Sequence, residues 1–150
     1  MRVRRKGELL RVDFHPSEVE LLGVLLDDLE SLLAGLDTDD PVVQRLFPDG
    51  YTDDAGASAE FASLVAGDLR DDRAARIGAC RAELPPRGGQ VSLDAEAADR
   101  WIRVINDLRL SVGTRIGVTE EDELDPTDQA AALYHWLSAT QEILVEHLMA

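Results

Sequence analysis

Residues 101–118 constrain the fold most, because apolar side chains lie on nearly all sides of the helix that this stretch predicts. Five apolar residues recur at the spacing of one helix face: Trp101, Val104, Ile105, Leu108 and Val112. A neighbouring stripe carries an amide, a guanidinium and a position without a side chain: Asn106, Arg109 and Gly113. Such a helix needs neighbours on more than one side. We therefore expect it to be the central helix of a mainly α-helical protein.

The polar stripe of this helix allows two interpretations. Asn106, Arg109 and Gly113 can form a structural polar core, in which a carboxylate and an amide complete the hydrogen bonds of the guanidinium. The acidic candidates for this pairing are Asp68, Asp72 and Asp107. Alternatively, Arg109 and Asn106 bind a small anionic ligand between helices. We favour the structural interpretation.

Four more helices and two strands are predicted around this stretch. The first helix, 16–35, has a leucine stripe, and Ser17 with Glu20 has the capping-box spacing. A short helix follows at 42–47, a long one at 55–83, and a last one begins at Asp125-Pro126. Residues 9–14 and 90–93 have the pattern of strands, and we expect them to pair as a small two-stranded sheet. Segments 49–54 and 119–128 are predicted to be loops.

The charge of the chain is unusually acidic. Against 15 Lys and Arg stand 30 Asp and Glu, which gives a formal net charge of −15. Such a field repels nucleic-acid backbones and anionic membranes and favours a basic protein partner, although it can also serve solubility alone. We expect no direct nucleic-acid binding and no membrane binding.

The length of 150 residues suits one helical domain, 1–150, with residues 1–6 as a basic N-terminal arm. No apolar run is long enough to span a membrane, and no apolar segment follows the basic start as it would in a signal peptide. A cytoplasmic protein is therefore the expectation.

The last helix carries apolar residues on two faces, which predicts either deep burial or a surface shared with a second subunit. The residues of this possible dimer face are Leu133, Trp136, Leu137, Thr140, Ile143, Leu144 and Leu148. We expect a homodimer through this helix.

Motifs of catalysis and cofactor binding are not found in the sequence. It has no nucleophile elbow, P-loop, GxGxxG or HExxH pattern. The three histidines, His15, His135 and His147, do not have the i, i+4 spacing of metal ligands. We therefore predict a protein without catalytic residues, metal or cofactor.

Cys80 is the single cysteine, so an intramolecular disulfide is impossible. It follows Ile77 and precedes Leu84 on one apolar face, which favours a buried and inert thiol. The alternative is a redox-active cysteine whose pKa is lowered by Arg76 and Arg81.

Several short motifs resemble those of an actinobacterial family catalogued as a domain of unknown function. They are found at 45–51, 60–61, 68–70, 106–110, 113–118 and 134–137. The order and spacing of these motifs extend the resemblance over almost the whole chain.

The resemblance implies a regulatory function. The family includes an oxidative-stress regulator that is taken to bind a sigma factor through a switch formed by a cysteine pair. Members of the family are often encoded beside the ClpS protease adaptor. This implies, as an alternative function, an accessory of regulated proteolysis. With Cys80 alone, this chain departs from the family pattern at the residue type that carries the switch.

Overall fold

The protein is mainly helical, with five helices and one small sheet in the described part of the chain. The computed structural model describes residues 1–35, 37, 39–47, 57–117 and 129–150, so the predicted loops at 49–54 and 119–128 lie outside the described residues. In chain order the elements are β1 (Arg2–Lys6), β2 (Leu9–Phe14), α1 (Pro16–Gly35), α2 (Pro41–Leu46), α4 (Ala57–Glu83), β3 (Gly89–Leu93), α5 (Ala95–Arg115) and α6 (Gln129–Met149).

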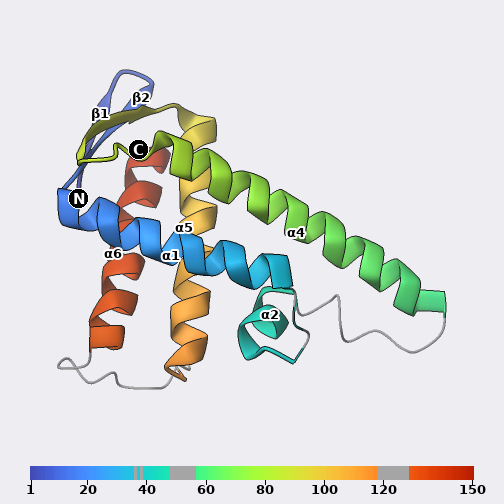
Figure 1. Ribbon diagram of the computed structural model, residues 1–150. Coiled ribbons are helices and arrows are strands. Elements are labelled where there is room, and N and C mark those ends of the chain that lie inside the picture. The colour runs from blue at the N-terminus through green and yellow to red at the C-terminus, as the bar shows by residue number, and fades with distance from the viewer. Residues whose placement is uncertain (36, 38, 48–56, 118–128) are drawn as a thin grey trace.

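Helix α5 contacts most of the other elements, including several that are distant from it in sequence. It packs against α6, α2, α4 and α1 and also touches β2 and β3. Figure 1 shows α5 and α6 side by side, while the N-terminal end of α4 extends beyond the other helices. Of the expected apolar stripe, Trp101, Val104, Ile105 and Leu108 are buried and Val112 is partly buried. Asp94 caps the helix by accepting a hydrogen bond from the Ala97 N–H at 2.8 Å.

The sheet has three antiparallel strands in the order β1-β2-β3, so the prediction of two strands was wrong. The expected pairing of β2 with β3 is present, and β1 adds a strand on the other edge. Lys6 pairs with Leu9 across a two-residue turn in which Gly7 has φ +64°, a conformation typical of tight hairpins. Only Val3 of β1 is buried, which is why the strand lacks the alternating pattern that reveals β2.

The basic start of the chain is therefore the edge strand β1 and not an arm. Its side chains Arg2, Arg4, Arg5 and Lys6 are exposed. Arg5 donates a hydrogen bond from Nη1 to the carbonyl of His147 at 2.8 Å, which joins the strand to the end of α6. Positive charges along an open edge discourage pairing with another strand.

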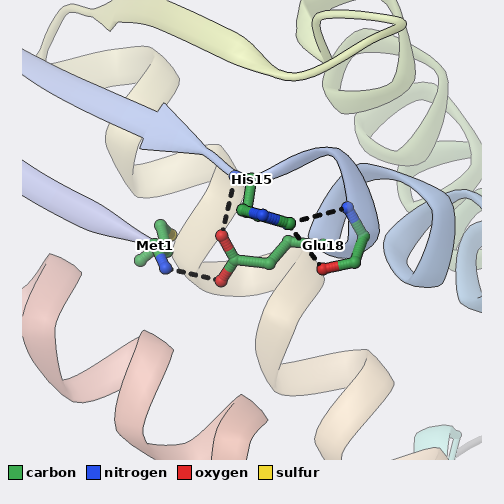
Figure 2. A network of polar contacts seen from close by, with 4 residues as sticks. Met1, His15 and Glu18 are labelled. Carbon is green, nitrogen blue, oxygen red and sulfur yellow. Dashed lines mark hydrogen bonds and ion pairs between the residues drawn. The ribbon is translucent and has the colours of Figure 1, made fainter.

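Helix α1 begins with a capping box that is shifted from the predicted one. His15 takes the capping position: its Nδ1 accepts from the Ser17 N–H, and the His15 N–H donates to Glu18 at 2.8 Å. The second oxygen of Glu18 forms an ion pair with the amino group of Met1 at 2.5 Å (Figure 2). The predicted pair of Ser17 with Glu20 was wrong because His15 can supply the acceptor that is usually a hydroxyl.

Helix α5 is joined to the end of α4 by one carboxylate. Glu83 forms an ion pair with Arg100 and accepts a hydrogen bond from the Trp101 indole N–H at 3.1 Å. The other side of Trp101 meets the ring of Phe14 from β2, with 5.7 Å between ring centroids. This residue therefore connects the sheet, α4 and α5.

Replacing Gly88 by alanine should destabilise the protein much more than the same change at Gly7. Gly88 has φ +82°, and an added Cβ would lie 2.9 Å from Pro16 and 3.0 Å from the Phe14 carbonyl oxygen. The strain and overpacking together should lower the free energy of unfolding by about 2–5 kcal/mol. Gly7 has a similar φ but open space around it, so about 1–2 kcal/mol is expected. Urea denaturation measures both, and equal losses would contradict the close approach at Gly88.

Glu18→Gln should lower the free energy of unfolding at pH 7 by about 1.5–3 kcal/mol, the range for hydrogen bonds to a charged group. Burial raises the pKa of Glu18, but hydrogen bonds from the Met1 ammonium and the His15 N–H outweigh it and hold this pKa below its ordinary value of 4.5. The carboxylate therefore stabilises the fold above pH 4.5, and this contribution disappears as the pH falls through the lowered pKa.

Urea denaturation of Glu18→Gln between pH 7 and pH 3 should accordingly show a shallower acid loss than the unmodified chain. Glu20→Gln is the matched control, because Glu20 is exposed on the same helix. A slope unchanged by Glu18→Gln would exclude this carboxylate as a source of acid sensitivity.

Candidate functional site

The face of α6 that was predicted to form a dimer is largely used inside the protein. Leu137, Thr140 and Leu144 are buried against the chain's own core. The remaining four are partly buried and pack against the same core: Leu133, Trp136, Ile143 and Leu148. Only these four retain surface that another molecule could contact.

Two residues of that face line an apolar groove between α1 and α6. The groove has a volume of about 460 Å³ and is lined by Leu21, Gln129, Ala130, Ala132, Leu133 and Trp136. Leu21 remains 37% exposed although it is a large apolar residue. The sequence pattern missed Leu21 because it lies beside the leucine stripe that turns toward the core.

Apart from histidine, the charged residues of the two helices that form the groove are all Asp or Glu. Helix α1 has five carboxylates and no Lys or Arg, and α6 has Glu142 and Glu146 and likewise no Lys or Arg. Glu18 lies at this corner, where a hydrogen bond with the Trp136 side chain also contributes to its lowered pKa. The groove therefore has a mainly apolar lining between two helices that carry carboxylates and no Lys or Arg, although Glu18 itself is paired with the Met1 ammonium.

The polar stripe of α5 contacts side chains of α6 through two of its residues, Asn106 and Arg109. Asn106 accepts a hydrogen bond through Oδ1 from Gln141 at 3.3 Å, and Gly113 is buried. The Arg109 guanidinium lies 5.8 Å from the centre of the Tyr134 ring. Its Nε is buried and has no hydrogen-bond acceptor among the described residues. A structural role for the stripe stays a prediction.

The acidic candidates for Arg109 form no ion pair with it in the described part of the chain. Asp107 instead pairs with Arg73 of α4, with 3.3 Å between Oδ2 and Nε. Asp72 is exposed, and the Asp68 side chain lies outside the described residues.

The Arg73–Asp107 pair is a feature that the sequence did not reveal. Arg73 also stacks over the ring of Phe47, 4.7 Å from its centre, so one side chain connects α4, α5 and the residue after α2. Burial raises the pKa of Asp107 even though Arg73 and Arg76 favour its charged form. In the sequence, Arg73 stands in the charged run 68–76, which gives no sign of a contact with Asp107.

Cys80 is buried, and the lowered pKa that a redox role would need is not found. The residue is 0% exposed, and burial together with the charge of Glu83 raises the pKa of its thiol from 9.0 to about 12. Arg100 and Arg76 act in the opposite direction but do not compensate. This agrees with the favoured interpretation of a buried thiol and counts against the alternative of a thiol activated by Arg76 and Arg81, because desolvation of the thiolate exceeds the attraction of the arginines.

Neither a metal centre nor a membrane span can be built from the residues that the structure describes. In them, no three His, Cys, Asp or Glu side chains come together as metal ligands. Likewise, none of the described helices has both the length and the apolar character needed to cross a bilayer.

Comparison with known proteins identifies the family. The chain belongs to the family described as Domain of unknown function (DUF2017), whose model matches residues 1–148. It is 30% identical to the oxidative stress regulator AosR of Mycobacterium tuberculosis (strain ATCC 25618 / H37Rv), over 97% of this chain and 84% of the relative. It is also 30% identical to the putative oxidative stress regulator AosR of Mycobacterium leprae, over 83% of this chain and 68% of the relative.

The family resemblance of the short motifs is thereby confirmed. No solved structure matches the chain.

Cys80 should react very slowly with a thiol reagent in the folded protein. A pKa of about 12 in place of 9.0 leaves roughly a thousandfold less thiolate near neutral pH, and burial blocks access in addition. Labelling by a chromogenic disulfide reagent at pH 8 should therefore be at least about a thousandfold slower than in urea. Because the chain has one cysteine, Cys80→Ala is a complete control. Rapid labelling of the folded chain would overturn the buried assignment.

Proposed function

We propose that the protein is a non-catalytic regulator that binds a basic helix of a protein partner in the groove between α1 and α6. The single observation that carries this proposal is the combination of an apolar groove with flanking helices that contain carboxylates but no Lys or Arg. An amphipathic helix with apolar anchors and basic flanks satisfies both features.

The apolar anchor points of the groove are suited to a protein partner. Trp136 is only partly buried, and tryptophan is among the residue types that dominate binding energies at interfaces. Leu21 and Leu133 line the groove beside it. The groove is open to solvent along one helix, and side chains of a partner helix at i, i+3, i+4 and i+7 would reach such a surface.

Charge favours a foreign partner over a second copy of the chain. In a two-fold dimer through this groove, α1 and α6 of one copy would face the same acidic helices of the other. Like charges brought together in this way oppose association, whereas Lys and Arg on a partner would be attracted. The homodimer predicted from α6 is thus the competing outcome, and the net charge of −15 counts against it.

The names of the relatives support a regulatory role under oxidative stress. Carried over to this chain, they make a sigma factor the first partner to test, in agreement with its acidic charge. The mechanism of this chain would not use a disulfide within one molecule, because Cys80 is its single cysteine. We therefore propose that binding depends on the groove itself.

Leu21→Asp should weaken binding of a purified sigma factor from the source organism by at least about tenfold. The change places a charge in the apolar groove, and a loss of about 1.4 kcal/mol corresponds to tenfold in Kd. Val24→Asp is the matched control: it adds the same charge on α1 at a residue that is 54% exposed and outside the groove lining. Surface plasmon resonance at 50 and 150 mM salt measures both variants, and binding should weaken at the higher salt.

Three results would contradict this proposal. The first is equal weakening by Leu21→Asp and Val24→Asp, which would place the contact elsewhere. The second is no sigma-factor binding together with light scattering that shows a dimer lost in Leu21→Asp, which would assign the groove to a second copy. The third is binding of a proteolytic adaptor alone, which would support the accessory role in regulated proteolysis.

A further inference from the structure

A second and chemically different pocket lies between α4, α5 and α6. It has a volume of about 300 Å³ and is lined by Arg73, Arg76, Ile102, Arg103, Asn106, Asp107 and Gln141. The groove of the proposed function shares none of these residues. In a chain with net charge −15, three arginines around one small pocket are an unusual concentration of positive charge.

Two of the three guanidiniums are matched by carboxylates. Arg73 pairs with Asp107 at 3.3 Å, and Arg103 pairs with Asp99 at 2.9 Å near the exposed rim. Arg76 has no ion pair among the described residues, and its Nε is buried without a hydrogen-bond acceptor. Asp72, four residues away on the same helix, forms no ion pair with Arg76 either. Arg76 thus has no ion pair of its own among the described residues, although the charge of Asp107, which pairs with Arg73, lies near enough to interact with it.

The two amides of the pocket are bonded to each other and leave one donor, Asn106 Nδ2, and one acceptor, Gln141 Oε1. Asn106 uses Oδ1 to accept from Gln141, at 3.3 Å. Its Nδ2 therefore remains as a donor, and no described residue accepts from it. Asp107, the one carboxylate of the lining, is already engaged by Arg73. The arginines and the Asn106 donor favour a ligand that carries hydrogen-bond acceptors and negative charge.

We propose that this pocket binds a small oxyanion, phosphate or carboxylate, with Arg76 as its main contact and the amide of Asn106 as a second donor. The planar guanidinium donates two parallel N–H bonds to such an anion, and a buried setting strengthens them. The acidic exterior keeps the polyanionic backbone of a nucleic acid away, which restricts the site to small ligands. Of the pair once predicted to hold an anion, Asn106 lines the pocket and Arg109 does not.

Binding at this site should stabilise the fold, because the walls of the pocket come from three different helices. A ligand at free concentration c that binds only the folded chain stabilises it by RT ln(1 + c/Kd), so the melting temperature rises with the ligand concentration. The site is also independent of the α1–α6 groove. Leu21→Asp should therefore leave anion binding unchanged, so that failure of one proposal can be told from failure of the other.

Thermal denaturation and isothermal titration calorimetry with sodium phosphate and sodium malonate, at constant ionic strength set by chloride, test the proposal. The melting temperature should rise with at least one of the two anions relative to chloride, and the stronger anion identifies the ligand chemistry. Arg76→Gln should weaken that binding by at least about tenfold. Arg70→Gln is the matched control on the same helix, since Arg70 is paired with Asp71 and does not line the pocket.

The outcomes separate specific binding from general salt effects. Phosphate stabilises many proteins without a site, but that effect would be equal in the unmodified chain, Arg76→Gln and Arg70→Gln. An equal response in all three, or no response beyond chloride, would overturn the proposal. If Arg76→Gln fails to fold, Asn106→Leu decides in its place, because it keeps every arginine and removes the amide donor. Unchanged anion affinity in folded Asn106→Leu would then reject the site.

Discussion

The rest of the structure depends on the contacts of Trp101. Its ring packs on Phe14 of the sheet, and its indole N–H reaches Glu83 at the end of α4, which also holds Arg100. A buried indole needs an acceptor for its N–H, and a buried carboxylate needs donors. Each group satisfies the other. The sheet, α4 and α5 are thereby fixed relative to one another at one end of α5, and α6 covers another of its sides.

Basic and acidic residues are distributed differently in this protein. Arginines of α4 reach α1 and α5 through carboxylates: Arg81 pairs with Asp27 at 2.6 Å and with Glu30 at 3.3 Å, and Arg73 pairs with Asp107. Half as many basic as acidic residues are present, and several of the basic ones are committed to these contacts. In α1, the carboxylates of Glu18, Asp27 and Glu30 are thereby paired with the Met1 ammonium or with Arg81. The helices α1 and α6 contribute no Lys or Arg of their own, so their remaining carboxylates keep these two helices acidic.

Sequence periodicity located every helix of the described fold, because each buried face repeats at helical spacing, as Leu22, Leu26, Leu29 and Leu33 do in α1. It missed β1, where only Val3 is buried, and it misplaced the cap at His15. The candidate sites were harder to predict. Leu21 and Trp136 line one groove from two different helices, and Arg73 pairs with Asp107 across two others. Such contacts depend on how helices cross, which no pattern within one helix encodes. The family was recognisable from short motifs alone.

The position of β3 has a consequence for how the chain folds. Strands β1 and β2 are joined by a two-residue turn, whereas the partner of Phe14 across the other edge of β2 is Gly89, with α1, α2 and α4 between them. Closing so long a loop costs chain entropy before any contact repays it. The hairpin can form early from local contacts, but β3 can join only when α4 has returned toward the start of the chain. Loop-closure entropy therefore favours formation of the β1–β2 hairpin before β3 joins it, and the pairing of β3 with β2 ties together the two ends of the segment that holds the first three helices.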